Sequence, residues 1–223
     1  MAMAYDAVIL DVDGTLVDSN DAHAHAWTEA FTAAGIAVPY SRARRLIGMG
    51  GDLLVPAAAM LDLDDPRGPI IEAQRAATFK TRWLGEVKPM PRARAFVEAL
   101  LGHGLRVAVA SAASGDELGA LLRLAEVDDL IDIRTSSDDA AWSKPNPDIL
   151  FAALARIPCP PDRAVFIGDT PYDLEAALFA RVDAIAVRSG GWSDALLIGA
   201  LAIYDDVAEL LAQLDTSPIF RTT

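Results

Sequence analysis

The sequence predicts an α/β protein: a doubly wound parallel sheet with a small all-helical domain inserted after the first strand. Two observations lead to this prediction. Short apolar runs alternate with helical patterns over most of the chain, and one long stretch near the start contains helical patterns but no convincing strand. A hydrophobic share of 52% supplies enough apolar side chains for a sizeable core, which excludes a disordered chain.

Apolar runs that each end on a polar or small residue predict the strands of the sheet. They lack the alternation of a half-exposed strand, as expected for parallel strands that are covered on both faces. The runs are residues 7–11, 106–111, 164–169 and 184–188, with weaker candidates at 131–135 and 202–204. Helical patterns such as 92–101 and 148–156 lie between them, and this order is typical of a doubly wound sheet.

Residues 16–88 interrupt this alternation. Their helical patterns cover residues 21–34, 41–47, 52–61 and 69–84. Because a connection of this length is not an ordinary loop, we expect a separate helical domain over residues 16–88, with hinges near 16–18 and 87–91. The α/β core then comprises residues 1–15 and 89–215, and residues 216–223 are expected to form a loosely held C-terminal tail.

The net charge and the cysteine content limit the partners and the cellular compartment that we expect for this protein. A formal net charge of −13 argues against nucleic acid or an anionic membrane as a partner. An anionic small substrate would need local positive charge from a metal or a placed lysine. Cys159 is the only cysteine, and neither a signal peptide nor a membrane-spanning run is evident, so we expect a cytoplasmic protein. The sequence leaves open whether it is a monomer or a weak dimer.

Carboxylates follow two of the predicted strands. Asp11 ends the first strand and Asp13 follows two residues later, while Asp169 stands at the end of the strand over 164–169. Asp13-Gly14 could simply form a turn, but that leaves Asp11 unexplained. Unit charges about 4 Å apart interact by roughly 4 kcal/mol at an effective dielectric of 20. A divalent cation such as Mg²⁺ would turn that repulsion into attraction.

Three further residues accompany these carboxylates. Ser111 ends a strand; it could be a helix cap, or its hydroxyl and the next backbone N–H, that of Ala112, could hold phosphate oxygens. Lys144 lies in a proline-flanked loop before a helix for which Asn146 is the expected N-cap. Asp173 follows Thr170 by three residues, which predicts a capping box and a structural role as readily as a functional one.

In this order, the motifs resemble those of the haloacid dehalogenase superfamily, in its phosphatase branch with a helical cap. The matching stretches span essentially the whole chain: DVDGTLVDSN at 11–20, Ser111, SKPNPD at 143–148 and GDTPYD at 168–173. The resemblance implies a Rossmann-like core and a phosphatase that acts on a small phosphorylated molecule with Mg²⁺ as its cofactor. Phosphoglycolate or a sugar phosphate is the substrate type that it suggests.

The resemblance also implies roles for the residues. Asp11 would be the nucleophile that forms an aspartyl-phosphate, and Asp13 the general acid and base. Ser111, Ala112 and Lys144 would hold the phosphoryl oxygens. The metal would be bound by Asp11, Asp169 and the backbone carbonyl of Asp13, with Asp173 supporting the metal or Lys144. The presence of Asp13 argues against the dehalogenases and phosphonatases of the superfamily, which lack it.

The inserted domain is expected to determine specificity. The spacing from Asp11 to His23 and Trp27 is similar to that in β-phosphoglucomutases, so a phosphomutase is the alternative to a phosphatase; a partly buried, structural His23 is equally open. The glycine-rich loop at 47–52, which includes Gly50, instead resembles phosphoglycolate-phosphatase-like members. Other candidate substrate contacts, which could equally be solvated surface charges, are Lys80, Arg75 and Arg82.

A non-catalytic receiver module of the response-regulator type is a third hypothesis. Such a module also combines acidic residues, a hydroxyl, a lysine and Mg²⁺ on a parallel sheet. Its phosphorylated aspartate, however, lies on a middle strand after the acidic pair, and it has no helical insertion. The order of the motifs in this chain and the long insertion argue against it.

Overall fold

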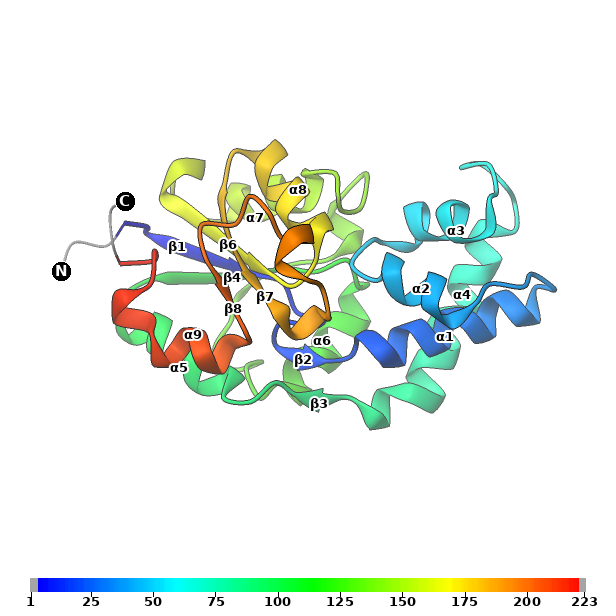
Figure 1. Ribbon diagram of the computed structural model, residues 1–223, viewed down its shortest axis with the longest axis horizontal. Coiled ribbons are helices and arrows are strands. Elements are labelled where there is room, and N and C mark those ends of the chain that lie inside the picture. The colour runs from blue at the N-terminus through cyan, green and yellow to red at the C-terminus, as the bar shows by residue number, and fades with distance from the viewer. Residues whose placement is uncertain (1–3, 221–223) are drawn as a thin grey trace.

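The computed structural model describes residues 4–220 and has the predicted architecture: a parallel six-stranded sheet with helices on both faces, and a helical insertion after its first strand (Figure 1). The sheet order is β5-β4-β1-β6-β7-β8. These strands are β1 (Ala7–Leu10), β4 (Arg106–Ala110), β5 (Ile133–Thr135), β6 (Ala164–Gly168), β7 (Asp183–Val187) and β8 (Ile203–Tyr204). Strand β1 pairs in parallel with β4 on one side and with β6 on the other, so the ends of these three strands are neighbours.

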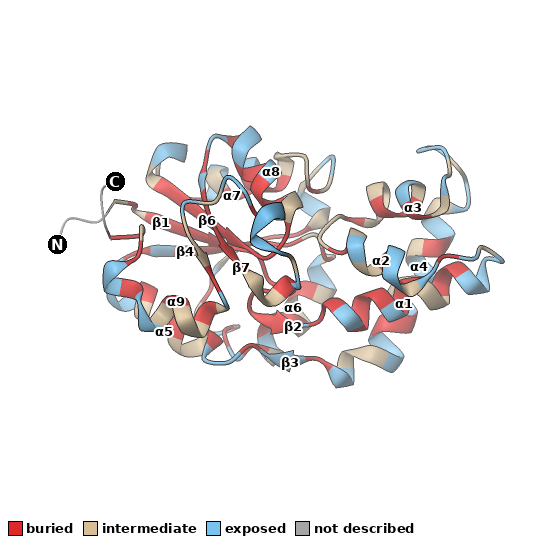
Figure 2. Ribbon diagram, in the orientation of Figure 1, coloured by how far each residue is buried: buried red, intermediate tan, exposed pale blue. Residues whose placement is uncertain are grey.

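The two faces of the sheet differ in the size of the side chains that they present. On one face, valine, leucine and isoleucine side chains pack against α5 (Ala93–Gly102), α6 (Gly115–Leu124) and α9 (Val207–Ala212). On the other, mostly alanines with Ile9 and Phe166 pack against α7 (Asp148–Arg156) and α8 (Pro171–Ala180). All four residues of β1 and all five of β6 are buried, as Figure 2 shows in red, and this explains why neither strand alternates in hydropathy.

The insertion forms a body of its own, which we call the cap, at the end of the core where the strands finish (Figure 1). It consists of α1 (Asn20–Ala33), α2 (Tyr40–Leu46), α3 (Gly51–Ala59) and α4 (Gly68–Thr78), the last continued by a π-helical turn at Phe79–Trp83 and a 3-10 turn at Leu84–Glu86. A separate apolar cluster that includes Trp27, Phe31 and Leu54 forms its core. The two connections to the α/β core pair with each other as short antiparallel strands, β2 (Val17–Asp18) and β3 (Lys88–Pro89).

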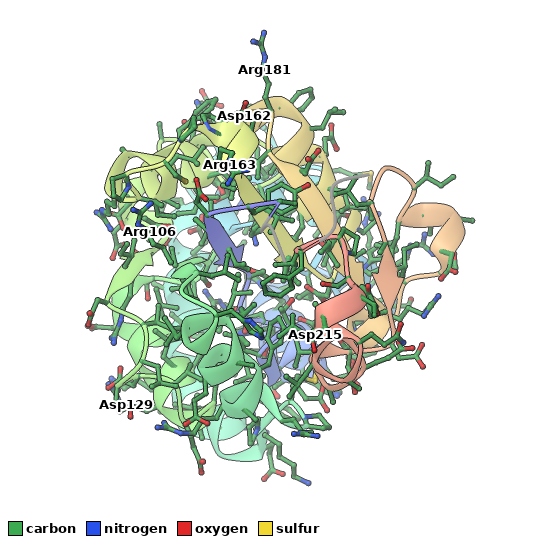
Figure 3. The ribbon with its side chains drawn as sticks, turned by 90° about the vertical axis from the view of Figure 1, so that its left-hand side faces the viewer. Arg106, Asp129, Asp162, Arg163, Arg181 and Asp215 are labelled. Carbon is green, nitrogen blue, oxygen red and sulfur yellow. The ribbon has the colours of Figure 1, made fainter. Side chains whose placement is uncertain are left out.

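The opposite end of the core carries charges of both signs at its surface. Figure 3 shows this end, with side chains such as Arg106, Asp162 and Arg181 around the starts of the strands. These residues are exposed, in contrast to the buried charges at the other end of the sheet. Among residues 4–220, no helix is both long and apolar enough to cross a membrane.

Two local predictions need correction. Helix α7 begins at Asp148 with Pro147 as its N-cap, one residue later than expected, and the Asn146 side chain instead donates a hydrogen bond to the Ser143 carbonyl at 3.1 Å. The expected loose tail is wrong for residues 217–220, because Ile219 and Phe220 are buried in the core cluster beneath α5 and α9. The rest of that predicted tail, residues 221–223, lies outside the described residues.

Candidate active site

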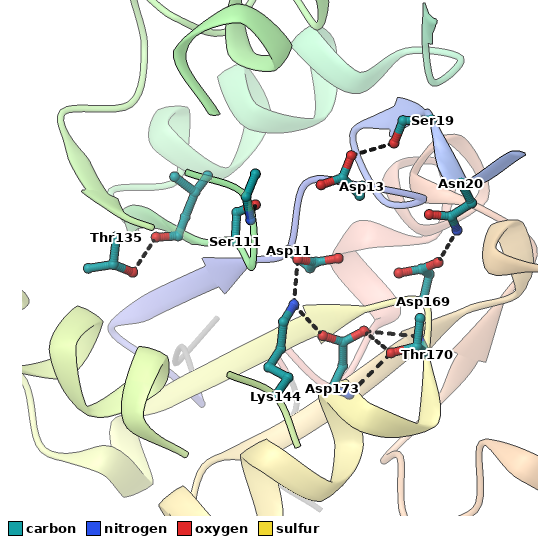
Figure 4. A network of polar contacts seen from close by, with 12 residues as sticks. Asp11, Asp13, Ser19, Asn20, Ser111, Thr135, Lys144, Asp169, Thr170 and Asp173 are labelled. Atoms are coloured by element: carbon teal, nitrogen blue, oxygen red, sulfur yellow. Dashed lines mark hydrogen bonds and ion pairs between the residues drawn. The ribbon is translucent and has the colours of Figure 1, made fainter. Parts of the chain in front are cut away.

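The sequence-predicted site residues of the core meet at the ends of three adjacent strands (Figure 4). Asp11 directly follows β1, Ser111 follows β4 and Asp169 follows β6. Since β1 lies between the other two strands, Ser111 and Asp169 flank Asp11 on either side. The backbone N–H of Asp11 donates to the Ile167 carbonyl at 2.8 Å, which extends the β1–β6 ladder into the site. Ligands of open α/β sheets bind at this edge.

Lys144 bridges two of the buried carboxylates. Its ammonium donates to Asp11 Oδ1 at 2.6 Å and to Asp173 Oδ1 at 2.8 Å, and its side chain is 1% exposed. Burial by itself would lower the pKa of Lys144, but the charges of Asp11 and Asp173 outweigh it and raise this pKa above its ordinary value. Lys144 is therefore a fixed cation beside Asp11, and Asp173 holds it there.

Asp173 also caps the start of α8, as its position three residues after Thr170 predicted. Its Oδ2 accepts hydrogen bonds from the Thr170 backbone N–H at 3.0 Å and hydroxyl at 2.7 Å, which completes the expected capping box at the start of α8. The helix start and the lysine thus share one carboxylate. Because these contacts satisfy its carboxylate, Asp173 can be fully buried without acting as a nucleophile.

Asp169 is the carboxylate best placed to bind a metal. Carboxylate oxygens of Asp11, Asp169 and Asp173 all lie within 4.8 Å of one another. Asp169 Oδ2 accepts from the Asn20 amide at 2.8 Å, whereas its buried Oδ1 has no hydrogen-bond partner. Burial, together with the neighbouring carboxylates, raises the pKa of Asp169 well above its ordinary value. An unpartnered buried carboxylate oxygen among other carboxylates is the donor set that a divalent cation fits.

Gly14 makes room for this acidic cluster. A Cβ on Gly14 would lie 2.0 Å from Asp169 Oδ2 and 2.3 Å from Asn20 Nδ2, and its φ of +74° favours glycine independently.

Burial, with Asp173 and Asp13 nearby, raises the pKa of Asp11 to about 7 even though Lys144 opposes this shift. The cluster is therefore short of positive charge.

Asp13 points away from this cluster, towards the cap (Figure 4). Its Oδ1 accepts from the Ser19 hydroxyl at 2.5 Å and lies 2.8 Å from His23 Nε2. Burial alone would raise the pKa of Asp13, but His23 and then Ser19 outweigh it, so this pKa lies below its ordinary value. His23 is 6% exposed and stacks on Phe79 at 4.0 Å between ring centroids, which fixes the imidazole against Asp13.

Ser111 and Ala112 lie on the other side of Asp11. The Ser111 hydroxyl accepts a hydrogen bond from the Ala113 backbone N–H at 3.1 Å and remains able to donate its own proton. Ala112 and Ala113 both line the cavity described next, so this turn faces the same space as Asp11.

A cavity of about 40 Å³ separates the core from the cap. Asp11, Asp13 and Lys144 form its floor, and the rest of its lining consists of His23, Trp27, Ile47, Gly48, Met49, Gly50, Gly51, Arg75, Ala112, Ala113 and Glu117. This volume suffices for a few water molecules only.

Only some of the cap residues predicted to contact a substrate lie at the cavity. Gly50 lies at the cavity, where a Cβ would approach the Ser143 Oγ to 1.9 Å, so only glycine lets the loop at 47–52 rest on the loop that carries Lys144. Arg75 also lines the cavity. Lys80 does not: it is exposed and borders a different hollow, because its neighbour Phe79 occupies the inward face. Arg82 pairs with Glu29 on the surface of the cap.

Sequence reasoning missed the roles of Ser19 and Asn20. Both are buried, and they hold Asp13 and Asp169 respectively. The sequence signal, a serine and an asparagine before a helical pattern, is the ordinary signature of a helix start, although the Ser19 side chain makes no capping hydrogen bond. Their position close to Asp11 and Asp13, within the motif at 11–20, is the sequence signal that could have indicated these roles.

Comparisons with known proteins agree with this geometry. The family model of the haloacid dehalogenase-like hydrolases matches residues 5–181. The chain therefore belongs to this family of hydrolases.

Individual relatives show which branch of this family the chain belongs to. A phosphoglycolate phosphatase of Rhodospirillum rubrum is 32% identical over 215 residues, covering 92% of this chain and 88% of that protein. Protein CbbY of Cereibacter sphaeroides is 31% identical over 227 residues, covering 96% and 99%. Among solved structures, a hydrolase from Pseudomonas syringae superposes with a TM-score of 0.88 at 30% identity, covering 94% of this chain and 98% of that one. The chain lies in the branch that contains this phosphoglycolate phosphatase and CbbY.

Proposed function

We propose that this enzyme is a Mg²⁺-dependent phosphatase that hydrolyses a small phosphomonoester through an aspartyl-phosphate on Asp11. One observation carries the proposal: the Asp11 carboxylate is buried at the floor of the cavity, bonded to Lys144 at 2.6 Å and adjacent to Asp169. A buried carboxylate held by a lysine beside a further acidic group is suited to attack on phosphorus rather than to packing.

The reaction proceeds in two steps. A carboxylate oxygen of Asp11 forms a bond to phosphorus as the bond from phosphorus to the leaving oxygen breaks, and Asp13 gives a proton to that oxygen. Asp13, now ionised, takes a proton from water, whose oxygen attacks the phosphorus of the aspartyl-phosphate. The bond from phosphorus to the Asp11 oxygen breaks, which releases inorganic phosphate and restores the Asp11 carboxylate and the protonated Asp13. Asp13 makes both contacts to Ser19 and His23 through Oδ1. These contacts fix the carboxyl group, and the arriving phosphoryl charge raises its pKa towards the protonated form.

The remaining residues neutralise and orient the phosphoryl group. Lys144, the Ser111 hydroxyl and the Ala112 backbone N–H supply positive charge and hydrogen-bond donors for its oxygens. Asp11, Asp169 and the Asp13 backbone carbonyl would hold Mg²⁺. When bound, the cation would stabilise negative charge on the phosphoryl oxygens and favour the ionised form of Asp11, whose pKa burial otherwise raises to about 7.

Turnover of p-nitrophenyl phosphate tests the proposal. We expect hydrolysis in Mg²⁺ that chelation by EDTA removes and added Mg²⁺ restores, and a loss of at least about 10⁴-fold in kcat for Asp11→Asn. Asp18→Asn is the matched control, since Asp18 lies on the same segment but is exposed. Unchanged activity in Asp11→Asn, or turnover that is insensitive to EDTA, would rule out the mechanism.

A phosphomutase with the same core chemistry is the second candidate, favoured by the contact between His23 and Asp13. Such an enzyme must also hold a second phosphate at the cap. The cap arginine at the cavity, Arg75, is already paired with Glu117, which favours hydrolysis. Isomerisation of a sugar phosphate that depends on added bisphosphate, detected by ³¹P NMR, would instead establish the mutase.

A further inference from the structure

We propose that Asn20 is a positioning residue of the cation site: its amide holds one oxygen of Asp169, so that Asp169 offers a single oxygen and the site favours Mg²⁺ over the larger Ca²⁺. The inference rests on the proposed function, since it concerns the cation that Asp11 and Asp169 would bind there. It gives the site a physical basis for choosing between two cations of equal charge.

Among residues 4–220, the Asn20 side chain forms a hydrogen bond with Asp169 alone. Asn20 is the first residue of α1 in the cap and is 2% exposed. Its Nδ2 donates to Asp169 Oδ2 at 2.8 Å, across 149 residues of sequence, and its Oδ1 has no hydrogen-bond partner in the described part of the chain. Loss of this amide would therefore remove no described hydrogen bond except the one to Asp169.

Two glycines lie against the same oxygen of Asp169. A Cβ on Gly14 would lie 2.0 Å from Asp169 Oδ2, and a Cβ on Gly190 would lie 2.3 Å from it. Neither distance leaves room for a side chain, so only glycine backbone fits at these two positions. The two glycines and the Asn20 amide together enclose Oδ2.

Hydrogen bonds hold the two glycines in place. The Ser189 hydroxyl donates to the Gly14 carbonyl at 2.6 Å, which joins the loop that carries Gly14 to the loop that carries Gly190. The Gly190 carbonyl accepts from Arg44 Nη2 of the cap at 2.8 Å. Because both loops are tied in this way, Oδ2 is held between fixed backbone segments.

The other oxygen of Asp169 is the one left for a cation. Asp169 Oδ1 is buried without a hydrogen-bond partner among the described residues, and Figure 4 shows it on the side of Asp11. With Oδ2 enclosed and Oδ1 free, Asp169 is arranged to bind a cation through one oxygen only.

Binding through one oxygen suits the smaller of the two cations. Mg²⁺ requires near-ideal octahedral geometry, whereas Ca²⁺ accepts about six to eight oxygens and can take both oxygens of one carboxylate. While Asn20 holds Oδ2, Asp169 cannot supply the second oxygen that Ca²⁺ would use; without the amide, the carboxylate can turn and offer both. Since the two ions carry the same charge, loss of a neutral amide changes their Coulombic attraction alike, and the difference between them reports the geometry.

Titration of the protein with each cation, followed by Tm, tests the proposal. A cation that binds only the folded protein raises Tm by an amount set by its dissociation constant, and no substrate is needed. The rise that remains in Asp169→Asn is subtracted as binding elsewhere on this acidic protein. We expect the wild type to bind Mg²⁺ more tightly than Ca²⁺, and Asn20→Ala to lower the ratio of the two affinities at least about tenfold, mainly by weakening Mg²⁺.

A second substitution and a matched control complete the experiment. Asn20→Ser places a residue that is favoured at helix starts, but its side chain is one bond shorter and stops short of Asp169, so the ratio should fall here as well. It decides the question if Asn20→Ala does not fold. The control is Asn146→Ala, since Asn146 also donates through its amide, at 3.1 Å, but to the Ser143 carbonyl. Its ratio should equal that of the wild type.

Equal affinities of the wild type for the two cations would overturn the proposal. So would a ratio that the substitutions of Asn20 leave unchanged, because a merely structural asparagine would weaken both cations alike.

The outcome is distinguishable from failure of the proposed function. Turnover of p-nitrophenyl phosphate reports on the chemistry at Asp11, whereas the cation titrations involve no substrate. If the expected ratios are found without any turnover, the phosphatase proposal fails and the role of Asn20 stands. If the wild type and Asp169→Asn show the same rise in Tm, the cation site itself is absent and the role of Asn20 fails with it.

Discussion

The two walls of the cavity are built on different principles. On the core wall, charged groups are buried next to one another, and Lys144 bonds two carboxylates at once. On the cap wall, the lining is mostly apolar side chains and glycine backbone; His23 contacts Asp13, and Arg75 reaches across to a core residue, Glu117. The core wall concentrates charge for a reaction, whereas the cap wall supplies shape and a few polar contacts. Chemistry and selection should therefore respond differently to substitution.

The largest effect is expected from Lys144→Met on the core wall. Removing the ammonium leaves Asp11 and Asp173 without their shared partner, which should lower the free energy of unfolding by about 3–5 kcal/mol. Because Lys144 would also neutralise phosphoryl oxygens, kcat should fall by at least about 10²–10³-fold. Urea unfolding and p-nitrophenyl phosphate turnover measure the two effects.

Lys80→Met on the cap provides the comparison for that experiment. Lys80 is exposed and outside the cavity, so its loss should change the free energy of unfolding by less than about 0.5 kcal/mol. Equal destabilisation by the two substitutions would show that the network around Lys144 is not what distinguishes the core wall.

A smaller effect is expected from Gly50→Ala on the cap wall. The new Cβ would meet Ser143 Oγ at 1.9 Å and Cβ at 2.5 Å, so the cap loop must shift away from the core. We expect kcat/KM to fall about tenfold through misplacement of the cap. Gly68→Ala, at a cap position with no atom within 4 Å, is the control.

A second substitution sharpens this test. In a Ser143→Gly background, the obstructing side chain is gone, so Gly50→Ala should cost less than it does in the wild type. Identical losses in the two backgrounds would contradict a steric contact between the cap loop and the lysine loop.

The smallest effect is a pH-dependent change in thermal stability. Burial raises the pKa of Asp11 to about 7, and raises that of Asp169 as well, above the ordinary 3.8. The folded state thus binds protons more tightly than the unfolded state. The resulting stabilisation is fully present below about pH 4 and is lost as pH rises through 7. In EDTA, Tm should fall by about 5 °C between pH 5.5 and 8.

Mg²⁺ should suppress this fall, because a bound cation takes over the role of the protons. Asp169→Asn should likewise flatten the dependence of Tm on pH in EDTA, since one of the crowded charges is removed, whereas Asp18→Asn should not. The same Tm with Mg²⁺ and with EDTA at every pH would contradict a cation site between Asp11 and Asp169.

Most of the core could be predicted from the sequence because its signals are local. An apolar run that ends on a polar residue indicates both a buried strand and the edge at which it ends, so the positions of Asp11, Ser111 and Asp169 followed directly. The capping box of Thr170 and Asp173 was predicted from a three-residue spacing and is present. The contact of Asp173 with Lys144 spans 29 residues, and no local pattern encodes it.

The cap was harder to predict for the same reason. Its helices follow from periodicity, but which helix face meets the core depends on the packing of two separate bodies. Arg75, Lys80 and Arg82 are equivalent in the sequence, being basic residues on one helical stretch; only Arg75 of the three lines the cavity. The burial of Ile219 and Phe220, near the C-terminus, was missed because a short apolar pair without periodicity gives no signal of burial.

The sequence by itself determined the α/β class, the helical insertion and the set of acidic, hydroxyl and lysine residues, because strand ends and helix starts are specified by neighbouring residues. Only the tertiary structure decided that Asp13 turns to His23 while Asp169 turns to Asn20, and that Glu117 meets Arg75. The last two pairings join segments far apart in the chain, and the first joins the loop after a strand to one face of a helix. They form because each buried charge must find a partner within hydrogen-bond reach, and only the packed molecule determines which partner that is.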